Sequence, residues 1–142
     1  MTAYTWKMEW NDGMSVGIPE IDAEHRQFIF LVNEFNHAIT ERMGLSEIKL
    51  RLQNILDDAV QHFAHEEALF KEWNYPDTDI HASMHKAAFE ALQEIEAKFV
   101  NYNFEPEWIN AGLAVKDLLI EHVLTEDMKY AAFYRKSHSA SG

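Results

Sequence analysis

Residues 48–73 read IKLRLQNILDDAVQHFAHEEALFKEW, and their apolar positions recur every three or four residues. The stripe runs through Ile48, Leu52, Ile55, Ala59, His62, Glu66, Leu69 and Trp73. This spacing is typical of one face of an α-helix that packs against a core. His62 and Glu66 fall on that face, although burying a polar group without a partner costs several kcal/mol. The segment therefore predicts a helix that buries two polar side chains for a reason other than packing.

Three more stripes have the same spacing, and each also contains histidine. They are Ile21, His25, Phe28, Val32, Phe35, Ile39; His81, His85, Ala88, Leu92, Ile95, Phe99; and Trp108, Gly112, Val115, Leu119, His122. Turn and cap residues separate them: Gly17 and Pro19, Gly44 as a helix stop with Ser46 as an N-cap, a turn at 74–77 and a loop at 101–106. We expect helices at about residues 19–42, 46–73, 79–101 and 106–133, with a frayed tail from Ser137.

Composition restricts the class of protein. The 142 residues contain 47% hydrophobic side chains and no cysteine, which excludes disulfides and thiolate metal sites. The net charge of −12 argues against nucleic acid or an anionic membrane as a partner. No apolar run approaches the roughly 18 residues that span a bilayer, and we see no signal peptide. We expect a cytoplasmic, monomeric, single domain covering residues 1–142.

The expected fold is all-α: an antiparallel up-down-up-down four-helix bundle with an N-terminal extended lead. In that topology the starts of the first and third helices share one end of the molecule with the ends of the second and fourth. His25, His62, Glu66, His81, His85, His122 and Asp127 all lie near that end. One layer of the core can therefore hold all seven side chains, which predicts a metal centre.

Spacing indicates how each helix presents these residues. His62 and Glu66, like His81 and His85, are four apart and share a helical face. His122 and Asp127 are five apart, which on a regular helix turns them about 140° from each other. Both can point inward only if the helix widens locally, as in a π-bulge. The alternative is that Asp127 is a surface acid.

The composition of the set favours two metal ions. Five imidazoles exceed what one ion with an open position can use, whereas two carboxylates can bridge two ions. Five nitrogens and four carboxylate oxygens would fill nine of about twelve positions on two octahedral ions. A solvent oxygen shared by both ions would fill one position on each, which makes about eleven. Imidazole with some carboxylate and no thiolate favours iron over zinc, copper or nickel.

These residues resemble the hemerythrin-like family, specifically its single-domain bacteriohemerythrins. The resemblance covers nearly the whole chain: Val16-Gly17-Ile18, Ile21-Asp22, His25, His62-Phe63-x-x-Glu66-Glu67, Tyr75-Pro76, His81-x-x-x-His85 and His122-x-x-x-x-Asp127. It implies reversible O2 binding at a non-haem di-iron centre with a bridging oxo or hydroxo group. By that pattern His81, His85 and His122 saturate one iron, His25 and His62 bind the other, and Glu66 and Asp127 bridge. It also implies an apolar O2 pocket, placed here at Phe63, Leu119 and Val123.

Other polar residues have simpler interpretations. His37, His65 and His138 are expected at the surface. Glu24 and Glu67 adjoin ligands and either orient imidazoles or belong to a solvated face. The tryptophans are expected in core and bundle-end packing.

The expected function is O2 carriage without catalysis, with O2 as ligand and an O2-consuming enzyme as its recipient. A di-iron enzyme that handles peroxide or nitric oxide is one alternative, although oxygen-activating bundles use more carboxylates and two Glu-x-x-His motifs. An O2 or redox sensor is another, although no output module is visible. Iron buffering fits poorly with a ligand set that nearly fills the coordination positions.

Overall fold

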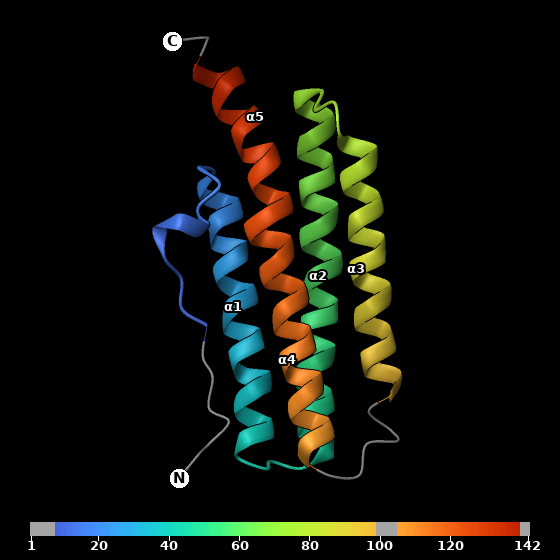
Figure 1. Cartoon of the computed structure of the whole chain (residues 1–142). Coiled ribbons are helices and arrows are strands. Elements are labelled where there is room, and N and C mark those ends of the chain that lie inside the picture. Colours follow the sequence, from blue (N-terminus) through green and yellow to red (C-terminus); the bar gives the residue numbers. More distant parts are fainter. Residues whose placement is uncertain (1–7, 99–104, 140–142) are drawn as a thin grey trace.

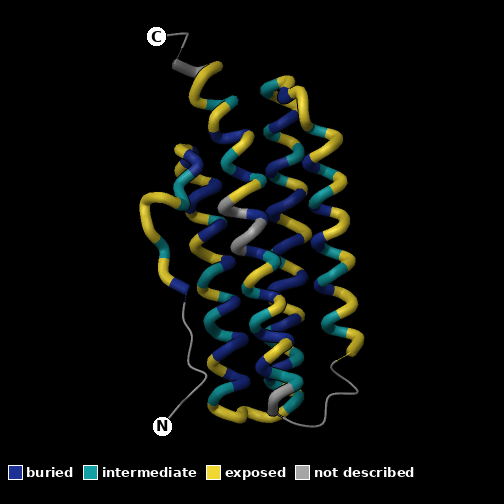
Figure 2. Tube along the Cα trace, viewed as in Figure 1, coloured by how far each residue is buried: buried dark blue, intermediate teal, exposed yellow. Residues whose placement is uncertain are grey.

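A computed structural model describes residues 8–98 and 105–139 of the chain. Across these residues the structure is helical and contains no strand, which confirms the all-α prediction. Figure 1 shows the helices as rods that lie side by side, with connections at their ends. α1 packs against α2 and α4, and α3 packs against both α2 and α4. The helices therefore surround a common interior, which Figure 2 shows as the buried face of each rod.

The chain enters α1 (Pro19–Thr40) through a segment fastened by one buried carboxylate. Asp22 accepts a hydrogen bond from Ser15 Oγ at 2.6 Å and another from the backbone N–H of Val16 at 2.9 Å. Gly17 has a φ of 80°, which residues with a Cβ rarely adopt. Pro19 occupies the first turn of α1, where its missing N–H costs nothing. These contacts hold Val16 and Ile18 against the top of the bundle, as buried residues.

The connection from α1 to α2 (Leu45–Trp73) differs from the prediction. Arg42 takes a left-handed φ of 53°, and the next N–H, that of Met43, bonds to the carbonyl of Ala38 at 3.0 Å. This Schellman-type end stops α1 at Thr40. Gly44, with a φ of 96°, is the N-cap of α2 rather than the stop of α1. The prediction of Ser46 as N-cap is wrong, because Ser46 already lies inside the helix.

The turn from α2 to α3 (Thr78–Lys98) follows the same scheme. Asn74 is left-handed, with a φ of 54°, and the N–H of Tyr75 bonds to the carbonyl of Phe70 at 2.9 Å. Tyr75 is thereby buried beneath the turn. The rest of the predicted third helix and most of the predicted loop at 101–106 fall on residues 99–104, outside the described part of the chain. The last two residues of that loop, Glu105 and Pro106, are already helical.

The last rod combines α4 (Glu105–Glu121), the π-helical segment η3 (His122–Glu126) and α5 (Asp127–Ser139). The π-helix lies between His122 and Asp127, as their spacing predicts. The helix also continues through Ser137 to Ser139, where we expected a frayed tail. Contacts explain the extension, since Tyr134 lies 4.9 Å from the ring of Trp73 and Arg135 donates to the carbonyl of Ser15.

Two apolar clusters fill the interior and leave a layer between them. The larger contains Phe28, Val32, Leu52, Ala59, Phe63, Leu92, Val115 and Leu119; the smaller contains Val16, Ile18, Ile21, Phe70, Tyr75, Tyr130 and Ala131. Full burial of each large side chain contributes about 1.5–3 kcal/mol to stability. Along each rod, the predicted ligands lie near the point where members of one cluster give way to members of the other. Among the described residues no helix is long and apolar enough to cross a membrane.

Candidate metal centre

All seven predicted ligands are buried between the two clusters. Their exposed fractions range from 0% for Glu66 and Asp127 to 7% for His122. They form two groups whose nitrogen and oxygen atoms lie within 4.8 Å of one another: Glu66, His81, His85, His122 and Asp127 in one, and His25, His62, Glu66 and Asp127 in the other. The structure thus brings together every residue of the predicted set, and the two groups share only Glu66 and Asp127.

Each shared carboxylate divides its two oxygens between the groups. For Asp127, Oδ2 lies 2.9 Å from His25 Nε2, and Oδ1 lies 3.0 Å from His81 Nε2 and also 3.0 Å from His122 Nε2. For Glu66, Oε2 lies 3.4 Å from His62 Nε2 and Oε1 lies 2.9 Å from His85 Nε2. Two carboxylates placed in this way can each contact two cations at once.

Most of these atoms are close without being hydrogen-bonded. Seven buried atoms of the layer have no hydrogen-bond partner: His25 Nδ1, Glu66 Oε1, His81 Nε2, His85 Nε2, His122 Nε2, Asp127 Oδ1 and Asp127 Oδ2. The Nε2 atoms of His25 and His62 lie 3.1 Å apart, and they can form a hydrogen bond only if one of them carries a proton. Buried polar groups are normally satisfied, so such a concentration of orphaned acceptors requires explanation. Metal ions bound between these side chains would satisfy six of the seven atoms. The exception is His25 Nδ1, which lies on the far side of its ring from Nε2, the nitrogen that faces the layer.

Two glutamates fix imidazole orientations from outside the layer. The Nδ1 atom of His62 is 2.5 Å from Glu24 Oε1, and that of His85 is 2.9 Å from Glu67 Oε2. A hydrogen bond at Nδ1 directs Nε2 inward and makes it a better donor to metal. The sequence allowed either an orienting role or a place on a solvated face for Glu24 and Glu67. Their hydrogen bonds show that both have the orienting role.

His65 has a partner that the sequence did not predict. Its Nδ1 lies 2.6 Å from Glu24 Oε2, so one carboxylate joins the buried His62 to a second histidine. With 34% of its side chain exposed, His65 lies at the surface as predicted, but a carboxylate from α1 reaches it. His37 is exposed, as expected, and the side chain of His138 lies outside the described residues.

Tyr130 is a site residue that sequence reasoning missed. It is fully buried, and its hydroxyl donates to Glu66 Oε2. Burial and the carboxylates of Glu66 and Asp127 raise the pKa of the phenol, so it stays a donor. Its position three residues after Asp127, on the same helical face, is the signal that could have revealed it.

Aromatic rings form the walls of the layer. Phe63 stacks on His85 with ring centroids 4.0 Å apart and lies 5.6 Å from His122. Phe28 meets His62 edge-on at 5.0 Å, and Phe70 meets His81 at 4.9 Å. Of the residues predicted to line an O2 pocket, Phe63 and Leu119 are buried in the larger cluster, while the side chain of Val123 lies outside the described residues.

Without metal, protons hold the layer together. Burial opposes charge on His62 and His25, but Glu66 and Asp127 outweigh it and raise the pKa of His62 to about 10 and that of His25 to about 8. Burial and Glu66 oppose the charge on Asp127, yet its histidine partners lower its pKa to about 2. The histidines likewise hold the pKa of Glu66 well below its usual range. The carboxylates are thus anionic and ready to bind cations.

An all-helical protein with a buried layer of imidazoles and shared carboxylates belongs to the class of helical cation-binding proteins. Residues 16–134 match the family model described as the hemerythrin HHE cation binding domain, and the chain belongs to that family.

Similar proteins agree with this membership. The chain is 29% identical over 119 residues to bacteriohemerythrin of Campylobacter jejuni, an alignment that covers 82% of this chain and 86% of that protein. It is 27% identical over 132 residues to bacteriohemerythrin of Stenotrophomonas maltophilia, covering 86% and 78% respectively. A crystal structure of a leucine-to-phenylalanine mutant superposes with a TM-score of 0.77 and 21% identity, covering 93% of this chain and 97% of that one. At that identity the match supports the fold alone.

Proposed function

We propose that this chain binds O2 reversibly at a non-haem centre of two iron ions, as a carrier or store rather than as an enzyme. One observation carries the proposal: Glu66 and Asp127 each direct one oxygen at each group of imidazoles. The bacteriohemerythrin names of the relatives point the same way. We infer that the scaffold is an antiparallel four-helix bundle with an extended N-terminal lead.

The residues fit two ions of this kind. His81, His85 and His122 would hold one iron, and His25 and His62 the other, with Glu66 and Asp127 bridging both. The second group offers one imidazole fewer than the first, so an ion held there would keep a position free for an added ligand. Two adjacent ferrous ions supply the pair of electrons on which reversible O2 binding depends.

The chain itself orients the side chains of the site and excludes water from it. Glu24 and Glu67 fix two imidazoles, and Tyr130 fixes the bridging carboxylate of Glu66. Phe28, Phe63 and Leu119 are buried around the layer and exclude water from it. Exclusion of water favours reversible O2 carriage, because water and protons promote oxidation of the iron and loss of the O2 in reduced form.

The composition of the layer separates carriage from catalysis. Five imidazoles against two carboxylates make the ligand set richer in nitrogen than the Glu-x-x-His sets of oxygen-activating bundles. A sensor would need the O2-bound state to alter a surface that a partner reads. Catalysis and sensing are therefore competing outcomes of the test below.

The test is anaerobic reduction followed by O2 titration, with metal analysis of the purified protein. We expect about two irons per chain and a visible absorption band that appears with O2 and disappears when O2 is removed. One metal per chain, or steady consumption of O2 without a bound state, would overturn the proposal.

Alanine variants distinguish ligands from bystanders. Glu66→Ala and Asp127→Ala should each lose most of the iron, because each removes an oxygen from both groups of imidazoles. His37→Ala is the control, since His37 is exposed. Equal iron loss from His37→Ala and Glu66→Ala would contradict the ligand assignment.

A further inference from the structure

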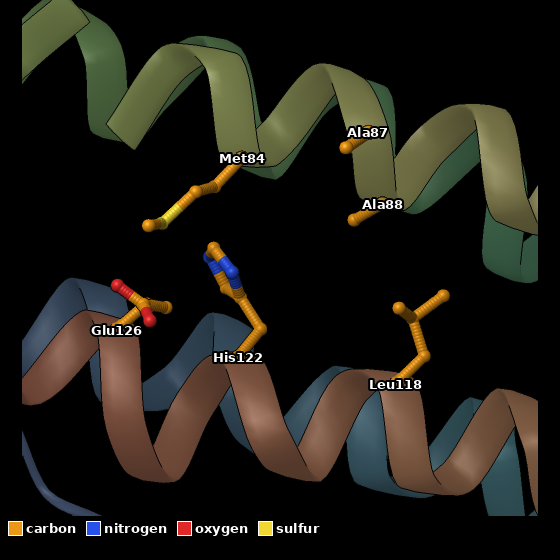
Figure 3. Close-up of a pocket in the computed structure, with 6 residues that line it drawn as sticks. All are labelled: Met84, Ala87, Ala88, Leu118, His122 and Glu126. Carbon is orange, nitrogen blue, oxygen red and sulfur yellow. The ribbon is translucent and has the colours of Figure 1, made fainter. Parts of the chain in front are cut away.

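A groove between α3 and the last rod, where α4 passes into η3, leads to one edge of the ligand layer. Its volume is about 240 Å3, and Met84, Ala87, Ala88, Leu118, His122 and Glu126 line it. Figure 3 shows the first three projecting from α3 towards the other three, with the imidazole of His122 pointing across the gap. The groove therefore opens on a predicted metal ligand.

His122 is the least covered member of the layer. It is 7% exposed, whereas the other six predicted ligands are between 0% and 3% exposed. His122 begins the π-helical segment, and its ring points towards α3, where Met84 lies opposite it (Figure 3). Ala87 and Ala88 line the same groove with short side chains.

A second groove reaches a ligand, but its floor is closed. It lies between α2 and α3, has a volume of about 400 Å3 and contacts His85. Phe63 covers that imidazole face to face at 4.0 Å with an interplanar angle of 8°. Glu67 occupies the Nδ1 atom of the same ring. A solute in this groove meets a stacked aromatic pair rather than an accessible ligand.

We propose that the groove between α3 and the α4–η3 part of the last rod is the route by which iron and small iron-binding solutes reach and leave the centre, with His122 as the first ligand they meet. The proposal rests on the proposed iron site but does not depend on O2 binding. Exchange through this groove requires displacement of one imidazole that is only 7% exposed, whereas in the groove at His85 a stacked aromatic pair blocks the way.

The chemistry of the groove suits a cation. Glu126 contributes a carboxylate at its mouth, and Met84 contributes a polarisable thioether opposite. Lys129 is 3.0 Å from Glu126 Oε2 but is 60% exposed, so the pair is solvated and weak. A ferrous ion can therefore replace Lys129 as the partner of Glu126 at small cost.

Release of iron from the loaded protein tests the route. Under anaerobic conditions, 2,2′-bipyridine captures released ferrous iron and reports it by colour. Ala87→Phe fills the groove from an exposed position and should slow release about tenfold, which corresponds to ~1.4 kcal/mol on the barrier. Met84→Ala widens the groove and should accelerate release by a similar factor.

The matched control is Ala64→Phe, because Ala64 is also exposed and lines the closed groove between α2 and α3. It should release iron at the unmodified rate. Equal slowing by Ala87→Phe and Ala64→Phe, or no acceleration by Met84→Ala, would overturn the route. An unmodified protein that holds no iron would instead count against the proposed function, so the two failures are distinguishable.

Discussion

Tyr130 on α5 donates a hydrogen bond to Glu66 on α2, and both side chains are fully buried. The accepting oxygen, Oε2, is the one that faces His62, and the other, Oε1, faces His85. The phenol thus holds the oxygen that faces one group of imidazoles and leaves the other oxygen directed at the second group. The hydrogen bond also ties the last helix to the second across the metal layer.

Removal of this hydroxyl should loosen Glu66. We expect Tyr130→Phe to retain iron but to lose about 1–3 kcal/mol of unfolding free energy in the chelated protein, because a buried carboxylate loses its donor. Urea unfolding measures this, and the visible spectrum of the loaded protein should shift. Tyr75→Phe is the control, since it removes a hydroxyl from the same apolar cluster. Equal losses from both variants would mean that the bond to Glu66 has no special role.

Glu24 should matter more for iron affinity than its exposure suggests. Its carboxylate holds both His62 and His65, so Glu24→Ala frees an imidazole of the layer. Such orienting partners are typically worth about 10–100-fold in metal affinity. We expect a loss of this size in competition with a chelator, and a smaller loss for His65→Ala. Glu20→Ala, one turn earlier and exposed, should leave affinity unchanged. The orienting role would be refuted if Glu20→Ala and Glu24→Ala behaved alike.

Periodicity and spacing could predict the ligand layer and the π-helix because both follow from helical geometry. Contacts between helices could not be predicted in this way. Glu24 and Glu67 each adjoin a ligand, and a residue one position away points about 100° off the buried face. Only the packing of α1 on α2 and of α2 on α3 decides that they reach imidazoles. The partner of His65 was not predicted for the same reason, since it lies on another helix.

The end of α2 shows a second limit of periodicity. The stripe predicts burial of Leu69 and Trp73, but Phe70 is the fully buried residue and the other two are only partly buried. The face turns because Phe70 packs against His81, Tyr75 and Tyr130. These partners come from outside α2, so the spacing of apolar residues within α2 could not predict the burial of Phe70.

Iron removal should destabilise the protein. Without metal, five imidazoles and two carboxylates remain crowded in one buried layer with unsatisfied atoms. Loss of partners for buried charges typically costs about 3–5 kcal/mol. For a chain of this size we expect the melting temperature to fall by roughly 10 °C or more on chelation under reducing conditions. Added ferrous iron should restore it. Identical melting with and without iron would show that the layer is not linked to folding.

The iron-free protein should lose stability as the pH rises above neutral. The folded-state pKa values of His25 and His62 are raised from 6.5 to about 8 and about 10. Their contribution is therefore complete below about pH 6.5 and is lost as the pH rises through 8 to 10. The pKa of Asp127 is lowered from 3.8 to about 2, so its contribution is present above about pH 3.8 and is lost towards pH 2.

Iron should reverse the alkaline trend, because iron binds deprotonated imidazoles and its retention improves as protons leave. Urea unfolding of chelated and loaded protein at pH 6 and pH 9 measures both trends. Greater stability of the chelated protein at pH 9 than at pH 6 would contradict the proton-held layer.

Leu119 should protect bound O2 through its apolar surface. It lies three residues before His122, is 4% exposed and packs in the same cluster as Phe63. Leu119→Ala opens space beside the layer and typically costs about 2–5 kcal/mol when the leucine is fully buried. Water admitted there would bring protons to the centre and promote oxidation of the ferrous iron. We therefore expect a variant that still holds two irons but whose oxygenated form decays faster.

Leu52→Ala separates this effect from general destabilisation. Leu52 is also buried in the larger cluster, but it lies ten residues before His62, which is about 15 Å along the helix. It should lose comparable stability without faster decay of the oxygenated form, as followed by visible absorption. Decay that is unchanged in Leu119→Ala, or equally fast in both variants, would mean that Leu119 only packs the core. The protection of O2 would then rest with other apolar residues around the layer, such as Phe28 and Phe63, whose rings contact His62 and His85.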